Sequence, residues 1–170
     1  MADMVYHIVA ATKSDIERIV RLLEENKNDP SMFVRSIKDV SRNIRDFLVA
    51  RDGDDLTIGC AALHRHTSSE AEILSVAIFP KIQGKGLGSM LTRECIKIAK
   101  EQNLGHLWLA TVKPEYFSRF GFVPFVRWKL PITVLLAKLR QILQQPVARW
   151  GPAILGEFTF MEHTGNEPVA

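Results

Sequence analysis

The sequence predicts an α/β (α+β) fold in which helices flank a mixed central sheet. The apolar run "ILSVAIFP" (73–80) has almost no polar face, which is typical of a strand buried on both sides at the centre of a sheet. A glycine-rich junction, a stretch with helical periodicity and a second apolar run, "HLWLAT" (106–111), follow it. This order predicts a parallel crossover, and turn signals between the earlier apolar runs predict antiparallel hairpins. At 170 residues, the chain is expected to form a single domain, 1–170, with about six to seven strands.

The elements before the glycine junction follow from capping and turn signals. We expect "VYHIVAA" (5–11) to open the sheet and Ser14 to cap a helix whose apolar face holds Ile16, Ile19, Val20 and Leu23. A second helical segment spans roughly 36–46. "FLVARDG" and "LTIGCAALHRHT" then flank the turn signal at 52–55, which predicts a hairpin.

After the junction, a helix is expected to end near residue 103, before the strand at 106–111. A short helix containing "EYFSRF" should end at Gly121 as its C-cap, and "FVPFVRWK" (122–129) should resume as a strand. An extra helical segment at about 131–155 comes next, and "EFTFME" (157–162) supplies a last strand.

The helix expected at 132–145 carries an apolar stripe, for which we predict core packing against the sheet. Two alternatives stay open, because a basic amphipathic helix can also lie on a membrane surface or bury its stripe in a homodimer. The stripe consists of Leu135, Leu136, Leu139, Ile142 and Leu143, with Lys138, Arg140 and Gln141 opposite.

Composition and charge exclude several classes of protein. The net charge is +3 and the basic residues are scattered, so no nucleic-acid partner is expected. No apolar run approaches the ~20 residues needed to cross a bilayer, and the N-terminus does not resemble a secretory signal, so we expect no stable membrane insertion. Cys60 and Cys95 lie in apolar segments and are expected to be buried free thiols, which fits a cytoplasmic location. His64 and His66 could face a cleft, but no third ligand is spaced to make a metal site.

The junction "QGKGLG" (83–88) has two physical interpretations. It is either a tight connection that needs permissive backbone or a cradle for an anion. At the start of a helix, N–H groups without intrahelical partners and the helix dipole both attract phosphate oxygens. The spacing matches neither a P-loop nor a dinucleotide fingerprint.

The segment "VAIFPKIQGKGLG" (76–88) and the amphipathic helix after it resemble the acetyl-coenzyme-A loop of the GNAT superfamily of N-acyltransferases. Gln83, Gly86 and Gly88 fill its Gln/Arg-x-x-Gly-x-Gly/Ala signature, and the resemblance spans roughly residues 5–128. It implies a GNAT fold with a splayed central pair of parallel strands, and acetyl-coenzyme A as co-substrate. It also implies that the backbone of the two strand residues Val76 and Ile78 contacts the thioester and pantetheine. The pyrophosphate would be held by the junction residues Gln83, Gly84, Lys85, Gly86, Leu87, Gly88 and Ser89.

Two side chains are candidates for catalysis. An amine acceptor must lose a proton before it attacks, and the resemblance offers Glu72, at the start of the central strand, as the general base. Burial beside apolar neighbours is expected to raise its pKa toward the useful range. The GNAT general acid is often a Tyr at the position that Phe117 fills here, so the adjacent Tyr116 is the candidate acid. A solvated strand-end Glu and a packed Tyr are the structural alternatives.

Local motifs are similar to the acetyltransferase domain of N-acetylglutamate synthases, notably "FVRS", "GCAAL" and "AEILSVAIFP". This resemblance implies that Arg35 binds an acceptor carboxylate, whereas the alternative is a surface Arg at a helix start. The sequence departs from that family after Pro131. The expected function is therefore transfer of an acetyl group to the primary amine of a small molecule such as an amino acid. Protein acetylation and a non-catalytic acyl-coenzyme-A-binding module stay open.

Overall fold

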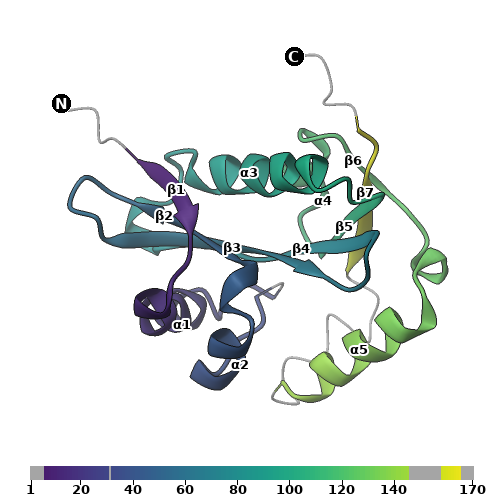
Figure 1. Cartoon of the computed structure of the whole chain (residues 1–170), viewed down its shortest axis with the longest axis horizontal. Coiled ribbons are helices and arrows are strands. Elements are labelled where there is room, and N and C mark those ends of the chain that lie inside the picture. The colour runs from purple at the N-terminus through teal and green to yellow at the C-terminus, as the bar shows by residue number, and fades with distance from the viewer. Residues whose placement is uncertain (1–5, 31, 146–157, 166–170) are drawn as a thin grey trace.

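The structure is a computed structural model, and it describes residues 6–30, 32–145 and 158–165 (Figure 1). Its centre is a seven-stranded sheet in the order β1-β2-β3-β4-β5-β7-β6. Only β4 and β5 pair in parallel, and the other neighbours are antiparallel, which confirms the predicted mixed sheet. The strands are β1 (His7–Ala10), β2 (Phe47–Arg51), β3 (Thr57–Arg65), β4 (Glu70–Ile78), β5 (His106–Thr111), β6 (Phe122–Pro124) and β7 (Thr159–His163).

Helices cover both faces of the sheet. Figure 1 shows α3 along one face, α1 and α2 on the other, and α5 on the α1 and α2 side at the far end of the molecule. Each face has its own apolar cluster, one under α3 and one under α1. The helices are α1 (Ile16–Glu25), α2 (Ile37–Arg42), α3 (Leu87–Glu101), α4 (Pro114–Ser118) and α5 (Ile132–Leu143).

Both cysteines lie in these clusters. Cys60 and Cys95 are fully buried free thiols, as the sequence predicts. Burial disfavours the thiolate and raises the pKa of each to about 12. They are therefore packing residues with little reactivity.

The start of α1 differs from the prediction that Ser14 caps it. A 3-10 turn, Lys13–Asp15, precedes the helix, and Thr12 and Asp15 form a capping box around it. The Thr12 N–H donates to the Asp15 carboxylate at 2.8 Å. Ser and Thr are both good helix caps, so the local sequence allows a helix start at Ser14 or at Thr12. The hydrogen bonds of Asp15 to residues elsewhere in the fold decide between these two starts.

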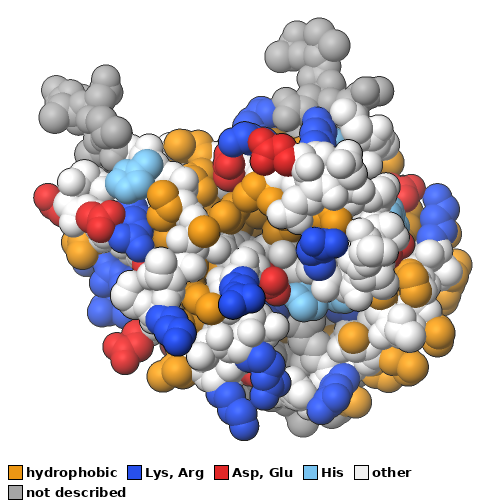
Figure 2. All heavy atoms as spheres, in the orientation of Figure 1, with side chains coloured by type: hydrophobic (Ala, Val, Ile, Leu, Met, Phe, Trp, Pro, Cys, Tyr) orange, Lys and Arg blue, Asp and Glu red, His pale blue; other side chains and the backbone are white. Residues whose placement is uncertain are grey.

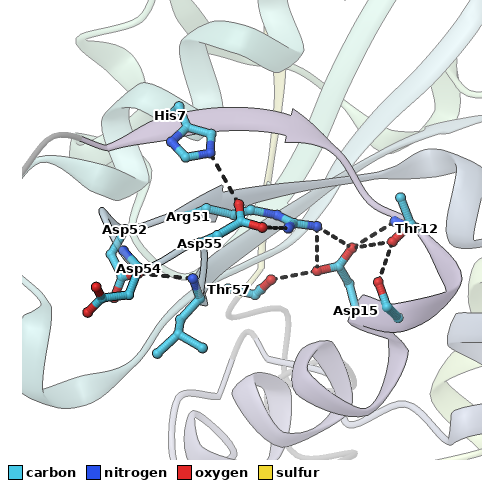
Figure 3. Close-up of polar contacts among 10 residues, drawn as sticks. His7, Thr12, Asp15, Arg51, Asp52, Asp54, Asp55 and Thr57 are labelled. Carbon is cyan, nitrogen blue, oxygen red and sulfur yellow. Dashed lines mark hydrogen bonds and ion pairs between the residues drawn. The ribbon is translucent and has the colours of Figure 1, made fainter.

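Asp15 joins the start of α1 to the distant β2–β3 hairpin (Figure 3). Its carboxylate accepts hydrogen bonds from the Thr57 hydroxyl at 2.6 Å and from the Arg51 guanidinium at 3.1 Å. Burial opposes its ionisation, but the hydrogen bonds from Thr57 and Thr12 and the charge of Arg51 outweigh burial and hold the pKa of Asp15 below its usual value. The network fixes the start of α1 against the β2–β3 hairpin.

The strand pair at the centre of the sheet opens along its length. Parallel pairing of β4 with β5 begins at Glu70 and His106 and ends at Glu72 and Trp108, although β4 continues to Ile78. On its other side, β4 has a bulge, because Ser75 and Val76 face the single β3 residue between the pairs Cys60↔Ala77 and Ala62↔Leu74. Ser75 has φ +57°, a strained value for a residue other than glycine. Since a bulge bends and twists its strand, it turns β4 away from β5 and produces the predicted splay.

The C-terminal part corrects two predictions. The strand expected at 122–129 is only the short β6, because a 3-10 turn, Arg127–Lys129, follows it. The apolar stripe of α5 was expected in the core, yet Leu136, Leu139 and Leu143 are more than half exposed. Hydrophobic side chains gather over α5 in the space-filling view (Figure 2). Val134, by contrast, is buried with Leu130 and Trp108.

The surface that α5 covers explains why the face of this helix that was predicted to be buried is exposed. The inner face of α5 meets a polar cavity lined by the buried Glu72 carboxylate, so Lys138 turns inward and Leu136, Leu139 and Leu143 turn outward. Leu135 is partly buried and packs against the cluster that contains Val134. Leaving a buried carboxylate without a countercharge costs more free energy than leaving a leucine side chain exposed. The dimer and membrane-surface alternatives for this face stay predictions. Within the described part of the chain, no helix is both long and apolar enough to cross a membrane. Residues 146–155 of the predicted extra segment lie outside the described residues.

The orientation of α5 predicts the effect of two matched substitutions on stability. Leu130→Ala removes a buried side chain and should lower the free energy of unfolding by about 2–5 kcal/mol. Leu139→Ala truncates an exposed side chain and should change it by less than about 0.5 kcal/mol. Urea unfolding followed by circular dichroism measures both. Equal losses for the two variants would contradict the orientation of α5.

Candidate active site

The glycine junction presents unpaired backbone N–H groups to a groove. Gly84 and Gly86 have φ values of +81° and +82°, in the left-handed region that favours glycine. The first hydrogen bond of α3 runs from the Met90 N–H to the Gly86 carbonyl. Among the described residues, the N–H groups of 84–89 have no hydrogen-bond acceptor. Together with the dipole of α3, they form a surface suited to phosphate oxygens.

These residues line a groove of about 470 Å³ between β4, the junction and α4. The groove contains most of the predicted cofactor contacts, namely Val76, Ile78, Gln83, Gly84, Gly86, Leu87, Gly88 and Ser89. Lys85 is exposed and lies outside the lining. The Ile78 carbonyl already accepts hydrogen bonds from Asn26 at 3.0 Å and Gln83 at 3.2 Å, so it anchors the junction.

The sequence analysis missed several polar residues of this groove, namely Asn26, Asp29, Thr111, Lys113 and Arg119. Asn26, at the end of α1, bonds both the Ile78 carbonyl and the Gln83 side chain. Arg119 donates to the Ser89 hydroxyl at 3.1 Å and so places a cation at the start of α3. Only the basic character of "YFSRF" could have indicated Arg119, and nothing local indicated Asn26.

The groove leads into the gap between β4 and β5. A cavity of about 80 Å³ fills this gap, and Val76, Thr111 and Phe117 line both the cavity and the groove. At its other end, the gap reaches Glu72 and Lys138. A chain of atoms could therefore extend from the junction through the split sheet to Glu72.

Beyond the gap lies a third cavity, of about 220 Å³, on the α2 and α5 side of the sheet. It shares Arg35, Glu72, Leu74 and Lys138 with the gap. Its lining residues are largely polar and charged. Ala137, Lys138 and Gln141 come from α5, and Gln144 and Gln145 directly follow it. We call this third space the acceptor cavity, after the acceptor that the resemblance of the sequence leads us to expect.

Glu72 is the centre of a buried polar cluster in the acceptor cavity. Its side chain is 2% exposed and forms an ion pair with Lys138. The His66 Nε2 atom lies 3.0 Å from a Glu72 carboxylate oxygen, and the His66 ring stacks on Trp108 with ring centroids 5.5 Å apart. A carboxylate can only accept, so the His66 Nε2–H donates. His64 also lines the cavity and contacts Asp46 at 2.6 Å.

The expectation that burial raises the pKa of Glu72 is wrong for this structure. Burial does oppose ionisation, but the charge of Lys138 and hydrogen bonds from His66 and Lys138 outweigh it and hold the pKa below the usual value. Lys138 comes from α5, more than sixty residues along the chain, and its contact with Glu72 had no sequence signal. His66 was signalled, because an i, i+2 pair on a strand shares one face.

Arg35 lies in the segment before α2 and is half-buried beside Glu72. Its Nε donates to the Ser75 hydroxyl at 3.1 Å, and its side chain lines both the gap and the acceptor cavity. Burial lowers the pKa of Arg35, and the charges of Glu72, Asp39 and Asp46 partly offset that effect. In the described ranges, no carboxylate lies within ion-pair distance of its guanidinium. Its planar fork is thus left to bind another anion.

Tyr116 lines the groove at the glycine junction and does not line the gap between β4 and β5. A Cβ atom added to Gly88 would meet the Tyr116 hydroxyl at 2.9 Å, so this hydroxyl lies against the start of α3. The Arg119 guanidinium stacks over its ring at 4.2 Å. Phe117, not Tyr116, lines both the groove and the gap.

Among the described residues, no group of three His, Cys, Asp or Glu side chains is arranged to hold a metal ion.

The splayed pair, the junction and the acceptor cavity define a protein that can align an elongated anionic ligand with a polar pocket across a sheet. The profile of the acetyltransferase (GNAT) family matches residues 7–122, and the chain belongs to that family. It is therefore a GNAT N-acetyltransferase, related at low identity to amino-acid acetyltransferases.

Three similar proteins illustrate this relationship. An uncharacterized N-acetyltransferase of Chlorobaculum tepidum is 30% identical over 112 residues, which are 66% of this chain and 72% of that protein. An amino-acid acetyltransferase of Mycobacterium tuberculosis is 27% identical over 114 residues, 66% of this chain and 65% of that protein. The structure of N-acetylglutamate synthase from Neisseria gonorrhoeae, complexed with coenzyme A and N-acetyl-glutamate, superposes with a TM-score of 0.74 at 22% identity, over 94% of this chain. The chain spans 35% of that synthase.

The lowered pKa of Glu72 predicts how stability depends on pH. A carboxyl whose pKa is lower folded than unfolded adds stability above the unfolded value of about 4.3, and this stability is lost as the pH falls through the folded pKa. The free energy of unfolding of the native protein should therefore drop more between pH 7 and pH 3 than that of Glu72→Gln. Urea unfolding at each pH measures this difference.

The matched control is Glu115→Gln, which replaces an exposed glutamate on α4. This variant should follow the native pH dependence. If Glu72→Gln also follows it, the ion pair with Lys138 contributes nothing to folding.

Proposed function

We propose that this protein transfers an acetyl group from acetyl-coenzyme A to the primary amine of a small molecule that carries a carboxylate, with an amino acid as the favoured acceptor. The observation that carries the proposal is the continuity of three spaces. The groove at the junction, the gap between β4 and β5 and the acceptor cavity share lining residues in succession.

The cofactor side rests on backbone geometry. The N–H groups of 84–89 would bind the pyrophosphate of coenzyme A, with Arg119 as a further cation beside Ser89. The pantetheine arm would pass Val76 and Phe117 into the gap. Similar structures solved with coenzyme A support this assignment.

The chemical step needs a base and a means of stabilising the oxyanion. Glu72, ionised and with His66 beside it, is placed to take a proton from an amine in the acceptor cavity. The strained bulge at Ser75 and Val76 distorts the β3–β4 ladder where the thioester would lie. We therefore assign the Val76 N–H to the thioester oxygen, where charge develops during attack.

The acceptor side favours a small molecule over a protein. The acceptor cavity, at about 220 Å³, is below the ~300 Å³ at which sites for drug-sized ligands begin, and α5 closes one side of it. Arg35 lies at the wall of that cavity, and no carboxylate of the described residues forms an ion pair with its guanidinium. The names of relatives, amino-acid acetyltransferase and N-acetylglutamate synthase, support a substrate with both an amine and a carboxylate. Cytoplasmic location and homodimer formation stay predictions.

The first experiment is calorimetric titration with acetyl-coenzyme A, followed by release of free thiol with a panel of amino acids, polyamines and lysine peptides. We expect binding, and turnover with amino acids above the other classes. Turnover with peptides alone would favour a protein acetyltransferase. Binding with no turnover would favour a non-catalytic acyl-coenzyme-A-binding module, and no binding would contradict the proposal.

Arg35 provides the matched test of acceptor class. Arg35→Met should raise the KM for an amino acid roughly 10- to 100-fold, because a charged hydrogen bond is worth about 1.5–3 kcal/mol. The same variant should leave the KM for the corresponding amine without a carboxylate nearly unchanged. An equal rise for both acceptors would show that Arg35 acts only on the shape of the cavity.

The position of Tyr116 predicts a binding role rather than the acid role implied by resemblance. Tyr116→Phe should raise the KM for acetyl-coenzyme A several-fold, since the hydroxyl lies at the phosphate end of the groove. Its kcat should stay within about threefold of the native value, whereas loss of a general acid would lower kcat by about 10²–10⁴. Steady-state kinetics with varied acetyl-coenzyme A separates the two roles. A large loss of kcat, restored by adding Phe117→Tyr, would instead show that the site needs a hydroxyl acid.

A further inference from the structure

Lys138 is the only residue of α5 that reaches the gap between β4 and β5 among those the structure describes. Its side chain is 12% exposed, and its ammonium group contacts the Glu72 carboxylate. The Nζ atom also lies 5.5 Å from the centre of the Trp108 ring, in reach of a cation–π contact. A flexible side chain is thus held in one place by a carboxylate and a ring.

That place is where an acceptor amine has to be. Glu72 and Lys138 both line the gap and the acceptor cavity, so they lie at the junction of the two spaces. An amine there has its base in contact and faces the cavity that Val76 and Phe117 extend to the cofactor groove. A lysine Nζ is a primary amine and becomes a nucleophile when it loses one proton.

Other lysines of the chain differ in each of these respects. Lys113 and Lys129 are exposed, and their partners are the carboxylates of Asp29 and Glu162. Lys113 and Asp29 line the groove at the junction but not the gap. Neither carboxylate lies in the acceptor cavity. Lys138 alone among these three combines burial with contact to the candidate base.

We propose that Lys138 is an internal acceptor, which the protein acetylates on Nζ from acetyl-coenzyme A bound in its own groove. This inference rests on the proposed function and names a modification site within the same cleft. It gives the inward-facing Lys138 of α5 a chemical role beyond that of countercharge to Glu72.

The step balances within the residues at the site and the bound co-substrate. Glu72 takes one proton from the Lys138 ammonium, and the neutral Nζ attacks the thioester carbonyl carbon. The new C–N bond forms as the C–S bond breaks. Coenzyme A leaves as a thiolate and takes the second proton that the nitrogen loses, and Glu72 returns its proton to solvent.

Acetylation would change the site as well as mark it. The amide has no charge, so the ion pair with Glu72 is lost, and the carboxylate keeps only the His66 hydrogen bond. A buried carboxylate without its countercharge is a stronger base, because burial then dominates its pKa. The modified protein would therefore present a free base to an incoming amine.

The test incubates the purified protein with acetyl-coenzyme A and no acceptor. We expect a burst of free thiol equal to one per chain and a single added acetyl group, which peptide mass spectrometry locates on Lys138. The rate should be independent of protein concentration, because the transfer is intramolecular. Glu72→Gln should reduce acetylation of Lys138 by about 10²-fold or more, as loss of a general base does.

Controls distinguish enzymatic acetylation of Lys138 from chemical acetylation and from failure of the proposed function. Exposed Lys129 should acquire acetyl groups slowly and equally in the native protein and in Glu72→Gln, and Lys138→Arg should lack the burst. An unmodified Lys138 in a protein that turns over free amines would overturn this inference alone. Absence of acetyl-coenzyme A binding would overturn the proposed function together with it. A rate that rises with protein concentration would assign the transfer to a second chain and refute an internal acceptor.

Discussion

The separation of β4 from β5 is the constraint on which the rest of this structure depends. Pairing ends at Glu72 and Trp108, and the bulge at Ser75 turns the remaining part of β4 away. A sheet that stayed closed would bury these backbone groups in hydrogen bonds and leave no passage through its centre. Because it opens, the groove on the α3 side communicates with the polar cavity on the α2 and α5 side.

Opening the sheet exposes a buried carboxylate to the cavity, and this determines how the C-terminal helix packs. Glu72 lies at the fork, where isolation from water would strongly disfavour its charge. Lys138 and His66 compensate, and the helix that provides Lys138 then turns Leu136, Leu139 and Leu143 toward solvent. One electrostatic requirement at the centre of the site thus decides the orientation of a helix at the edge of the molecule.

The glycine junction is formed by residues close together in the sequence, whereas the acceptor cavity is formed by residues far apart in it. At the glycine junction, glycines at fixed spacing set φ values and leave N–H groups without acceptors within one short segment, so the sequence could predict this backbone geometry. On the acceptor side, Arg35, His66, Glu72 and Lys138 come from four separate segments. Their roles depend on one another. Burial alone predicts a raised pKa for Glu72, whereas the charge of Lys138 helps to lower it below the usual value.

The sequence alone determined the mixed sheet, the parallel crossover, the buried thiols and the glycine junction that opens α3, because period, turn residues and glycine spacing act over a few neighbouring residues. It did not determine the Thr12–Asp15 cap, the bulge at Ser75, the short β6 or the direction in which α5 faces. Each of these depends on a partner far along the chain, such as Thr57 for Asp15 or Lys138 for Glu72. Local preferences at such positions are nearly balanced, so burial of a charge and the need to pair it decide the outcome, and only the tertiary structure brings those pairs together.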